Sequence, residues 1–267
     1  MAVTPNSAIE ERRREIEKRR MAKRKKRRKA ALKRFSIFLC IVAVATFVIL
    51  SLTVFFPVKK ISVIYNGTHY TEEQVIKASG IKKGENLWMT GSSAEEDLPL
   101  KLPFIESAEV ERKFPSSITI KTKSAEPMFC FATKKDFYIC DKNYKVLEIR
   151  KKGDNKLVYI TGADIKTTTA GKKLSFVDPK KKDAIKKLVS KLKEKSLKLN
   201  SIDVSEIVDI KFRVENRLNV DLGSLAHFDG KISQLQEIVK NSQKDVQATL
   251  KLDSYDPENP KTMLKKE

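Results

Sequence analysis

Histidine and cysteine are scarce in this chain of 267 residues, which contains two histidines and three cysteines. His69 and His227 lie far apart in the sequence, and neither stands beside a recognisable nucleophile motif. Zinc sites use histidine and cysteine ligands, and serine-type catalysis needs a nucleophile with a histidine base. The composition therefore excludes a histidine-rich metal cluster, and we expect no catalytic residues, no metal and no cofactor.

One stretch does match a catalytic signature. Ser190-Lys-Leu-Lys193 fits the S-x-x-K sequence of penicillin-binding proteins, but the K-T-G and S-x-N sequences that accompany it are missing from the chain. The stretch lies in a lysine-rich amphipathic segment, where such a match is expected by chance. We therefore expect that the protein is not an enzyme.

Charge is missing from Phe35 to Phe56, although charged residues make up 33% of the chain. A helix over these 22 residues would span about 33 Å, enough to cross the hydrocarbon layer of a bilayer. A cleaved signal peptide has a shorter apolar region followed by a cleavage site of small residues. Here Ala43-Val-Ala45 lies in the middle of the run. The run predicts a retained single-pass transmembrane helix over residues 35–56.

The segment before this run is strongly basic. Residues 1–34 contain 15 lysines and arginines but only four acidic residues. Because basic residues beside a span stay on the cytoplasmic side, we expect a cytoplasmic arm over 1–34 and an extracellular part over 57–267. The cluster Lys23–Lys29 has no aromatic residue for base stacking, so it favours contact with anionic lipid headgroups over nucleic-acid binding.

Residues 57–125 alternate between elements in the order β-α-α-β-β. Thr71 is a good helix N-cap because acidic residues follow it, and Gly80 is a typical helix stop. Ser93 is expected to cap a second helix in the same way. The predicted elements are a strand over Val58–Tyr65, helices over 71–80 and 93–102, and strands over Ala108–Phe114 and Ser117–Lys123.

This order of elements resembles the POTRA domain and, at closer range, the FtsQ/DivIB family of bacterial cell division proteins. Several phrases follow one another as they do in that family. They are Ile61-Ser-Val-Ile-Tyr-Asn-Gly67, Tyr70-Thr-Glu-Glu-Gln-Val-Ile76, Gly84-Glu-Asn-Leu87, Leu102-Pro-Phe-Ile-Glu-Ser-Ala-Glu-Val110 and Arg112-Lys-Phe-Pro-Ser-Ser-Ile-Thr-Ile120. Together with the basic arm and the single span that precede them, these phrases are specific for that family.

The likeness continues through residues 126–255, which resemble the β-rich second domain of the family. A helix is predicted over 179–195, because its apolar residues share one face, and another begins near Gly230. The predicted strands are Met128–Ala132, Phe137–Cys140, Leu157–Gly162, Ile202–Ser205, Ile207–Val214, Arg217–Gly223 and Val246–Leu252. We therefore predict an α+β protein: a single transmembrane helix, a POTRA domain at 57–125, a mixed β-sheet domain with two packed helices at 126–255, and a disordered tail at 256–267.

Two cysteines flank the hairpin predicted between Met128 and Cys140. Cys130 and Cys140 lie symmetrically about Lys135, so a cross-strand disulfide is geometrically feasible in an oxidising compartment. Two buried free thiols are equally compatible with the sequence. The sequence leaves both alternatives open.

Exposed strand edges of β-rich domains bind partners by adding a strand. In some family members a final strand docks the partner, but the corresponding stretch here contains Pro257 and Pro260, and proline lacks the N–H that strand pairing needs. We therefore expect the docking edge earlier in the chain. The predicted partner-binding residues are Val246, Ala248, Thr249, Leu250, Lys251, Leu252, Asp253, Ser254 and Tyr255.

The resemblance implies a non-enzymatic scaffold of the divisome, at the division septum of the cell membrane. Its implied partners are FtsB/DivIC-like and FtsL-like single-span proteins, and through them the septal peptidoglycan synthase complex. A POTRA-type chaperone for exported polypeptides is the first alternative, and a membrane-anchored cell-wall enzyme is less favoured. A chaperone would bind unrelated extended peptides, so crosslinked pull-down from dividing cells discriminates between these functions.

Overall fold

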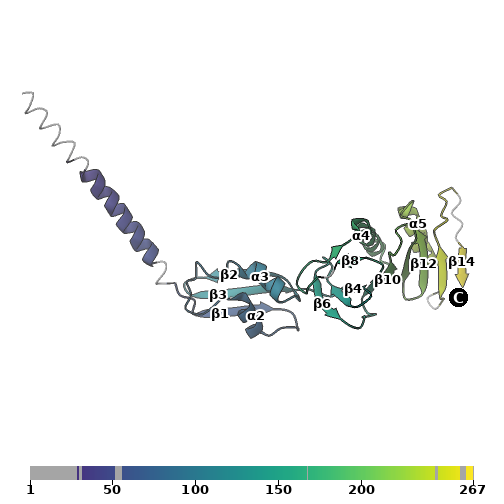
Figure 1. Cartoon of the computed structure of the whole chain (residues 1–267), viewed down its shortest axis with the longest axis horizontal. Coiled ribbons are helices and arrows are strands. Elements are labelled where there is room, and N and C mark those ends of the chain that lie inside the picture. The colour runs from purple at the N-terminus through teal and green to yellow at the C-terminus, as the bar shows by residue number, and fades with distance from the viewer. Residues whose placement is uncertain are drawn as a thin grey trace, which may run out of the picture.

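The computed structural model describes residues 29, 32–51, 56–166, 168–243 and 246–258, and the backbone of strand 263–266. These residues form three parts in series, an apolar helix, a small domain and a larger domain (Figure 1). The predicted α+β class, with an apolar helix followed by two mixed domains, is confirmed. Most of the predicted basic arm lies outside the described residues.

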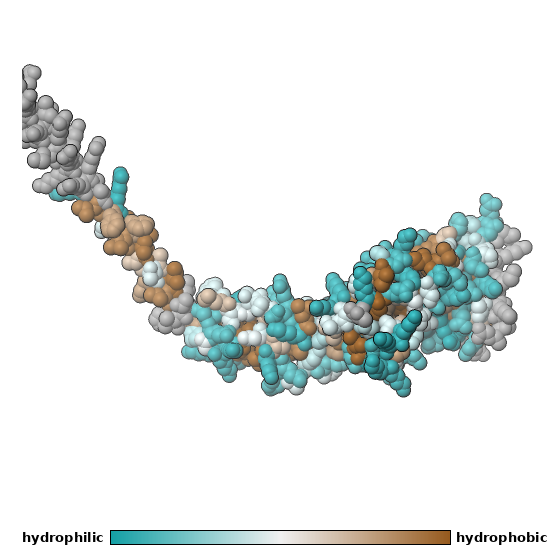
Figure 2. Space-filling model, in the orientation of Figure 1, coloured by the Kyte–Doolittle hydropathy of each residue, from teal (hydrophilic) through white to brown (hydrophobic). Residues whose placement is uncertain are grey.

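The apolar helix runs from Leu32 to Ser51, is long and apolar enough to cross a membrane, and packs against neither domain (Figure 2). Its predicted end at Phe56 is wrong, because Phe56 is not helical and its carbonyl accepts a 2.9 Å hydrogen bond from the N–H of Leu87. Pro57 explains the difference, since the residue before a proline avoids the helical conformation. Residues 52–55 lie outside the described residues.

The small domain has the predicted order β-α-α-β-β. Its sheet has the strand order β1-β3-β2, with β1 parallel to β3 and β2 antiparallel to it. The elements are β1 (Lys60–Tyr65), α2 (Glu72–Ser79), α3 (Ala94–Lys101), β2 (Ile105–Lys113) and β3 (Ser117–Ser124). Both helices contribute to its buried core, which includes Val75, Leu87, Leu98, Ile105, Ile118 and Ile120.

Helix α2 begins and ends where the sequence predicts. Thr71 Oγ1 accepts the N–H of Gln74, the Gln74 side chain accepts the N–H of Thr71, and Gly80 ends the helix at a φ of 74°. Ser93, in contrast, makes no capping hydrogen bond through its side chain. Its ψ of −13° keeps it in the helical region, whereas a capping residue is extended, so the predicted cap at Ser93 is wrong.

The larger domain, named the β domain, is built on a mixed nine-stranded sheet. The strand order is β14-β13-β12-β11-β10-β7-β4-β5-β6. The strands are β4 (Phe129–Ala132), β5 (Phe137–Cys140), β6 (Val146–Arg150), β7 (Val158–Thr161), β10 (Leu199–Asp203), β11 (Ile210–Val214), β12 (Leu218–Gly223), β13 (Ala248–Lys251) and β14 (Met263–Lys266), and β8 (Ile165–Lys166) pairs separately with β9 (Ser175–Phe176).

Two helices pack on this sheet, as predicted. They are α4 (Pro179–Glu194) and α5 (Phe228–Asn241), and Figure 1 shows both on the same side of the strands. Ile185, Leu188 and Leu192 of α4 share one buried cluster with Ile232 and Leu235 of α5 and with the inward residues of the strands. This cluster is the core of the β domain.

Both cysteines of the predicted hairpin are buried free thiols. In the β4–β5 pair, Cys140 lies opposite Phe129 and Cys130 lies opposite Ile139. Opposite residues share a face and neighbouring residues alternate, so the two thiols point to opposite faces of the sheet. Burial raises the pKa of both thiols. The hairpin register therefore excludes the disulfide, and burial favours the protonated form of both thiols.

The end of the chain differs from the sequence prediction. Residues Met263–Lys266 form strand β14, which pairs antiparallel with β13, so the predicted disordered tail is wrong for these four residues. Pro257 and Pro260 come before the strand, and all four of its residues have the N–H that pairing requires. Prolines close to a strand do not prevent it when they lie outside its ladder.

A buried lysine joins the two domains. Lys145 of the β domain donates hydrogen bonds through Nζ to the carbonyls of Pro99, at 3.2 Å, and Ile105. Burial lowers the pKa of this lysine, and the charges of Asp141 and Glu106 partly oppose the effect. Nearby, Lys142 Nζ lies 3.0 Å from Glu106 on the surface of the same junction.

Replacing Lys145 with methionine is expected to lower the free energy of unfolding of the small domain by about 1–3 kcal/mol, because the carbonyls of Pro99 and Ile105 lose their buried donor. Urea unfolding followed by the fluorescence of Trp88, the only tryptophan, measures this directly. Lys142→Met is the matched control and should cost much less, since the Lys142 side chain is exposed. Equal effects of the two variants would contradict the role of Lys145.

Candidate partner-binding edge

The predicted docking strand, β13, is not at an edge of the sheet. It pairs parallel with β12, where Thr249 lies opposite Asn219, and antiparallel with β14, where Thr249 lies opposite Lys265. The expectation that Val246–Ser254 forms the free edge is therefore wrong in this structure. It failed because the sequence analysis did not predict a strand after Pro260.

The side chains of β13 alternate between the core and the polar face of the sheet. Ala248 and Leu250 are buried against the helices, and Leu252 follows them into the core. Thr249 and Lys251 lie on the opposite face, where Lys251 is opposite Asp221 of β12. Strand β13 is therefore anchored in the core by Ala248 and Leu250, and only Thr249 and Lys251 are presented on the polar face.

Strand β14 is the open end of the sheet within the described part of the chain. It pairs only with β13 among these residues, whereas at the opposite end of the sheet the first residue of β6, Val146, is paired with the segment 171–174. There the Val146 N–H donates to the Lys172 carbonyl at 2.9 Å, and the Gly171 N–H donates to the Val146 carbonyl at 2.8 Å. The β6 end is thus paired at its first residue, and the β14 end offers backbone groups for pairing.

A buried arginine holds the segment that enters β13. Arg217, at the start of β12, donates through its guanidinium to the carbonyls of Gln243 (3.0 Å), Val246 (3.5 Å) and Val239 (3.3 Å). It also donates to Ser242 Oγ at 3.0 Å. One of these acceptors, the Val239 carbonyl, lies in the last turn of α5, where a cation is favoured by the helix dipole. Arg217 therefore fixes where β13 begins.

A buried lysine holds the other end of the same strand pair. Lys231 of α5 is 2% exposed, and its Nζ donates to the carbonyls of Leu222 (2.7 Å) and Ser224 (3.1 Å) at the end of β12. Burial lowers the pKa of this lysine. Neither buried cation is predicted from the sequence. The available signal was a lysine in the inward stripe of α5, between Phe228 and Leu235.

A tight turn follows β13. The Asp253 carboxylate accepts the N–H of Ser254 at 2.9 Å, and the Tyr255 N–H donates to the Leu252 carbonyl at 3.3 Å. The ring of Tyr255 lies against Gly230, where a Cβ would meet its hydroxyl at 2.6 Å. The predicted residues 253–255 therefore form a turn that packs on α5, and do not continue the ladder.

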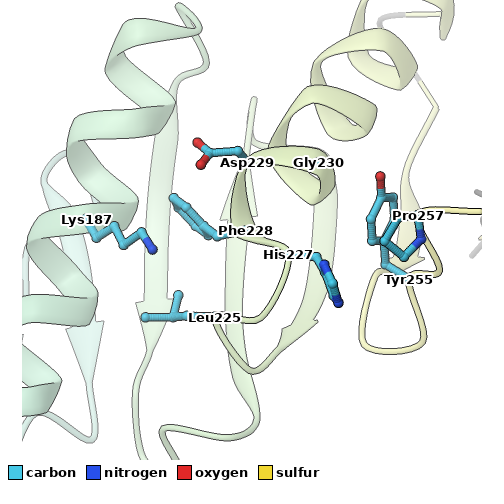
Figure 3. Close-up of a pocket in the computed structure, with 8 residues that line it drawn as sticks. All are labelled: Lys187, Leu225, His227, Phe228, Asp229, Gly230, Tyr255 and Pro257. Atoms are coloured by element: carbon cyan, nitrogen blue, oxygen red, sulfur yellow. The ribbon is translucent and has the colours of Figure 1, made fainter.

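A shallow groove of about 380 Å³ lies beside this turn (Figure 3). Lys187 Nζ sits 4.8 Å from the centre of the Phe228 ring, and the His227 and Tyr255 rings are 6.4 Å apart. The lining residues are Lys187, Leu225, His227, Phe228, Asp229, Gly230, Tyr255 and Pro257. The groove combines aromatic surface with charge and could accept a partner side chain next to the sheet edge.

Two kinds of catalytic site were considered from the sequence, an S-x-x-K nucleophile and a metal centre. Ser190 and Lys193 are exposed residues of α4. Within the described residues, the structure contains no group of three or more histidine, cysteine or acidic side chains arranged to hold a metal ion. The β14 edge offers backbone N–H and carbonyl groups to which an extended partner segment can pair.

Comparison with known proteins agrees with this description. A family model for the POTRA domain of the FtsQ type matches residues 56–123, which defines the class of protein as one with an apolar helix followed by an FtsQ-type POTRA domain. Residues 56–123 form a POTRA domain of the FtsQ type, and the chain is similar to cell division proteins named DivIB and FtsQ.

Three relatives illustrate the likeness. The cell division protein DivIB of Clostridium acetobutylicum is 27% identical over 164 residues, which is 61% of this chain and 65% of that protein. DivIB of Clostridium botulinum strain Hall is 28% identical over 187 residues, covering 68% of this chain and 72% of that protein. The cell division protein FtsQ of Corynebacterium glutamicum is 35% identical over 75 residues, covering 27% and 34%.

Proposed function

We propose that the protein is a non-enzymatic scaffold of the divisome, which binds FtsB/DivIC-like and FtsL-like single-span proteins outside the membrane and so helps control septal peptidoglycan synthesis. Similarity to cell division proteins supports the process. The apolar helix supports a single-pass anchor, with the basic arm in the cytoplasm at anionic headgroups. The observation that carries the binding role is the open β14 edge of the sheet.

Docking occurs by strand addition. An extended partner segment pairs with the backbone of β14, and main-chain hydrogen bonds provide affinity while neighbouring side chains provide selectivity. Thr249 and Lys251 then lie one strand away from the partner, on the polar face. The groove at Tyr255 takes a partner side chain beside the edge. Residues 246–255 thus act mainly by holding β14 in register.

Proline substitutions test this edge. Successive N–H groups of a strand point to opposite sides, so Leu264→Pro and Lys265→Pro remove one N–H that faces β13 and one that faces the open edge. Both variants should lose capture of a DivIC-like partner in a pull-down with purified proteins. Only one of them should also lower the stability of the β domain, measured by urea unfolding. Unchanged capture by both would refute docking at β14.

Deleting residues 259–267 tests whether the partner strand adds to β14 or replaces β14 on β13. If the partner adds to β14, the deletion abolishes capture. Stronger capture by the deleted chain would mean that the partner takes the place of β14 on β13, and would return the docking strand to Ala248–Lys251. The POTRA domain lies at the other end of the molecule and is the internal control for folding.

The divisome role itself is tested in cells. Crosslinked pull-down of the full chain from dividing cells should recover single-span division proteins and the septal synthase. Recovery of unrelated exported polypeptides instead would favour a chaperone function for the POTRA domain.

A further inference from the structure

Four large apolar side chains gather at one end of the POTRA domain. We name them the aromatic cap: Phe56, Trp88, Met89 and Phe114. The ring of Phe56 lies 6.5 Å from Trp88 and 5.9 Å from Phe114, and the rings of Trp88 and Phe114 are 4.9 Å apart. Three chain segments that are distant in sequence therefore meet in one aromatic cluster.

The aromatic cap is exposed although it is strongly apolar. The exposed fractions are 52% for Trp88, 76% for Met89 and 53% for Phe114, whereas Leu87 and Val58 beside them are fully buried. Removing such apolar surface from water is favourable. A contiguous exposed patch of this composition is typical of a surface that contacts another apolar phase.

The backbone beneath the aromatic cap is held in place. The Leu87 N–H donates to the Phe56 carbonyl at 2.9 Å. Arg112 donates through Nε to the Leu87 carbonyl and through Nη2 to the Thr90 carbonyl, both at 3.0 Å. The exposed side chains are therefore presented on a fixed loop, and an apolar phase can receive them without prior ordering of the chain.

The aromatic cap lies where the apolar helix joins the domain. Five peptide units separate Ser51 from Phe56, and an extended chain of that length covers at most about 18 Å. Residues 52–56 carry no charge. Figure 1 shows the helix and the β domain at opposite ends of the POTRA domain. If the helix spans a membrane, this end of the domain is at the membrane surface.

Lysines surround the aromatic cap. Lys59 and Lys60 follow Phe56, Lys82 and Lys83 precede the Trp88 loop, and Lys113 precedes Phe114; all are exposed. The Lys59 and Lys60 N–H groups both donate to the Ser116 carbonyl, which holds these lysines beside the Phe114 turn. Tryptophan is enriched at membrane interfaces, and lysine extends to anionic headgroups there.

We propose that the aromatic cap inserts into the headgroup region of the lipid leaflet from which the apolar helix emerges. The helix and the cap then fix the POTRA domain at two points on the membrane, which limits its rotation about the anchor. This inference rests only on the anchoring part of the proposed function and needs no division partner. The occupant is lipid, because the chain itself delivers the cap to the bilayer surface.

The single tryptophan allows a direct test. The full chain is reconstituted into vesicles of phosphatidylethanolamine and phosphatidylglycerol whose acyl chains carry bromine either near the carbonyl or near the methyl end. Trp88 fluorescence should be quenched, more strongly by bromine near the carbonyl. The control is the double variant Trp88→Phe/Val208→Trp, because Val208 is 71% exposed in the β domain, and its tryptophan should not be quenched. Equal quenching in the two proteins would overturn the proposal.

A second variant separates insertion from mere proximity. Met89→Glu places a charge in the aromatic cap without touching a core side chain, since Met89 is exposed. It should reduce the quenching of Trp88 and shift its emission to longer wavelength. Partner capture by the same variant reports the proposed function independently. Quenching that Met89→Glu leaves unchanged would also overturn the proposal.

Discussion

Replacing Thr249 with proline is expected to lower the free energy of unfolding of the β domain by about 3 kcal/mol or more, and to abolish partner capture as a result. Thr249 lies in the middle of β13, which is paired on both sides. Proline removes the N–H and is tolerated in sheets essentially only at edge strands and bulges. Urea unfolding followed by near-ultraviolet circular dichroism measures the loss.

Two controls isolate the backbone effect. Thr249→Val keeps the β-branched shape and should leave unfolding nearly unchanged. Lys251→Glu faces Asp221 on the polar side of the sheet, and like charges directly opposite cost at most about 1 kcal/mol. A Thr249→Pro protein of normal stability that fails to bind a DivIC-like partner would show that β13 is the free edge after all.

Replacing Gly162 with alanine is expected to cost about 3 kcal/mol or more in the stability of the β domain. Gly162 has a φ of 69°, and a Cβ built there would overlap the backbone of Ser205. The surroundings cannot move easily, since Lys181 Nζ donates to the carbonyls of both Gly162 (2.7 Å) and Ser205 (3.0 Å). Positive φ and a backbone clash therefore act together.

Gly80→Ala separates these two causes. Gly80 has a similar φ of 74°, but nothing lies within 4 Å of the position that a Cβ would take there. That variant should lose only about 1–2 kcal/mol from the conformational strain. The difference between the two glycine variants, measured by urea unfolding of each domain, reports the clash with Ser205. Equal losses would indicate that the β domain relaxes around the added methyl group.

Local signals predicted the regular elements well. The cap at Thr71, the stop at Gly80 and the apolar stripe of α4 depend on residues close in the sequence, and all three are confirmed. The predicted cap at Ser93 failed, because a serine before acidic residues indicates where a helix starts but not whether the backbone there is extended.

The open edge of the sheet could not be predicted in the same way. Its position depends on β14, a four-residue strand whose formation requires β13 as a template and which has no alternation long enough to detect. Arg217 and Lys231 were missed for a related reason. A buried cation is stabilised by carbonyls that the fold brings together, and those acceptors are not visible in the local sequence.

The aromatic cap is another feature that could not be predicted from the sequence. Its members are residues 56, 88, 89 and 114, and the hydrogen bonds of Leu87 and Arg112 bring their segments together. The sequence shows apolar residues at separate positions, and only the fold shows that they share one exposed end. Residues near a membrane anchor are therefore best assessed after the fold is known.

The arrangement of the domains in series places the β14 edge and the apolar helix at opposite ends of the chain path (Figure 1). A partner that is held by its own span must extend the length of both domains before its strand reaches β14. Partners whose outer segments are too short would be rejected whatever their sequence. Under the proposed docking at β14, the two domains set the minimum length of a partner's outer segment, and lengthening the partner's linker should rescue binding where a shorter linker fails.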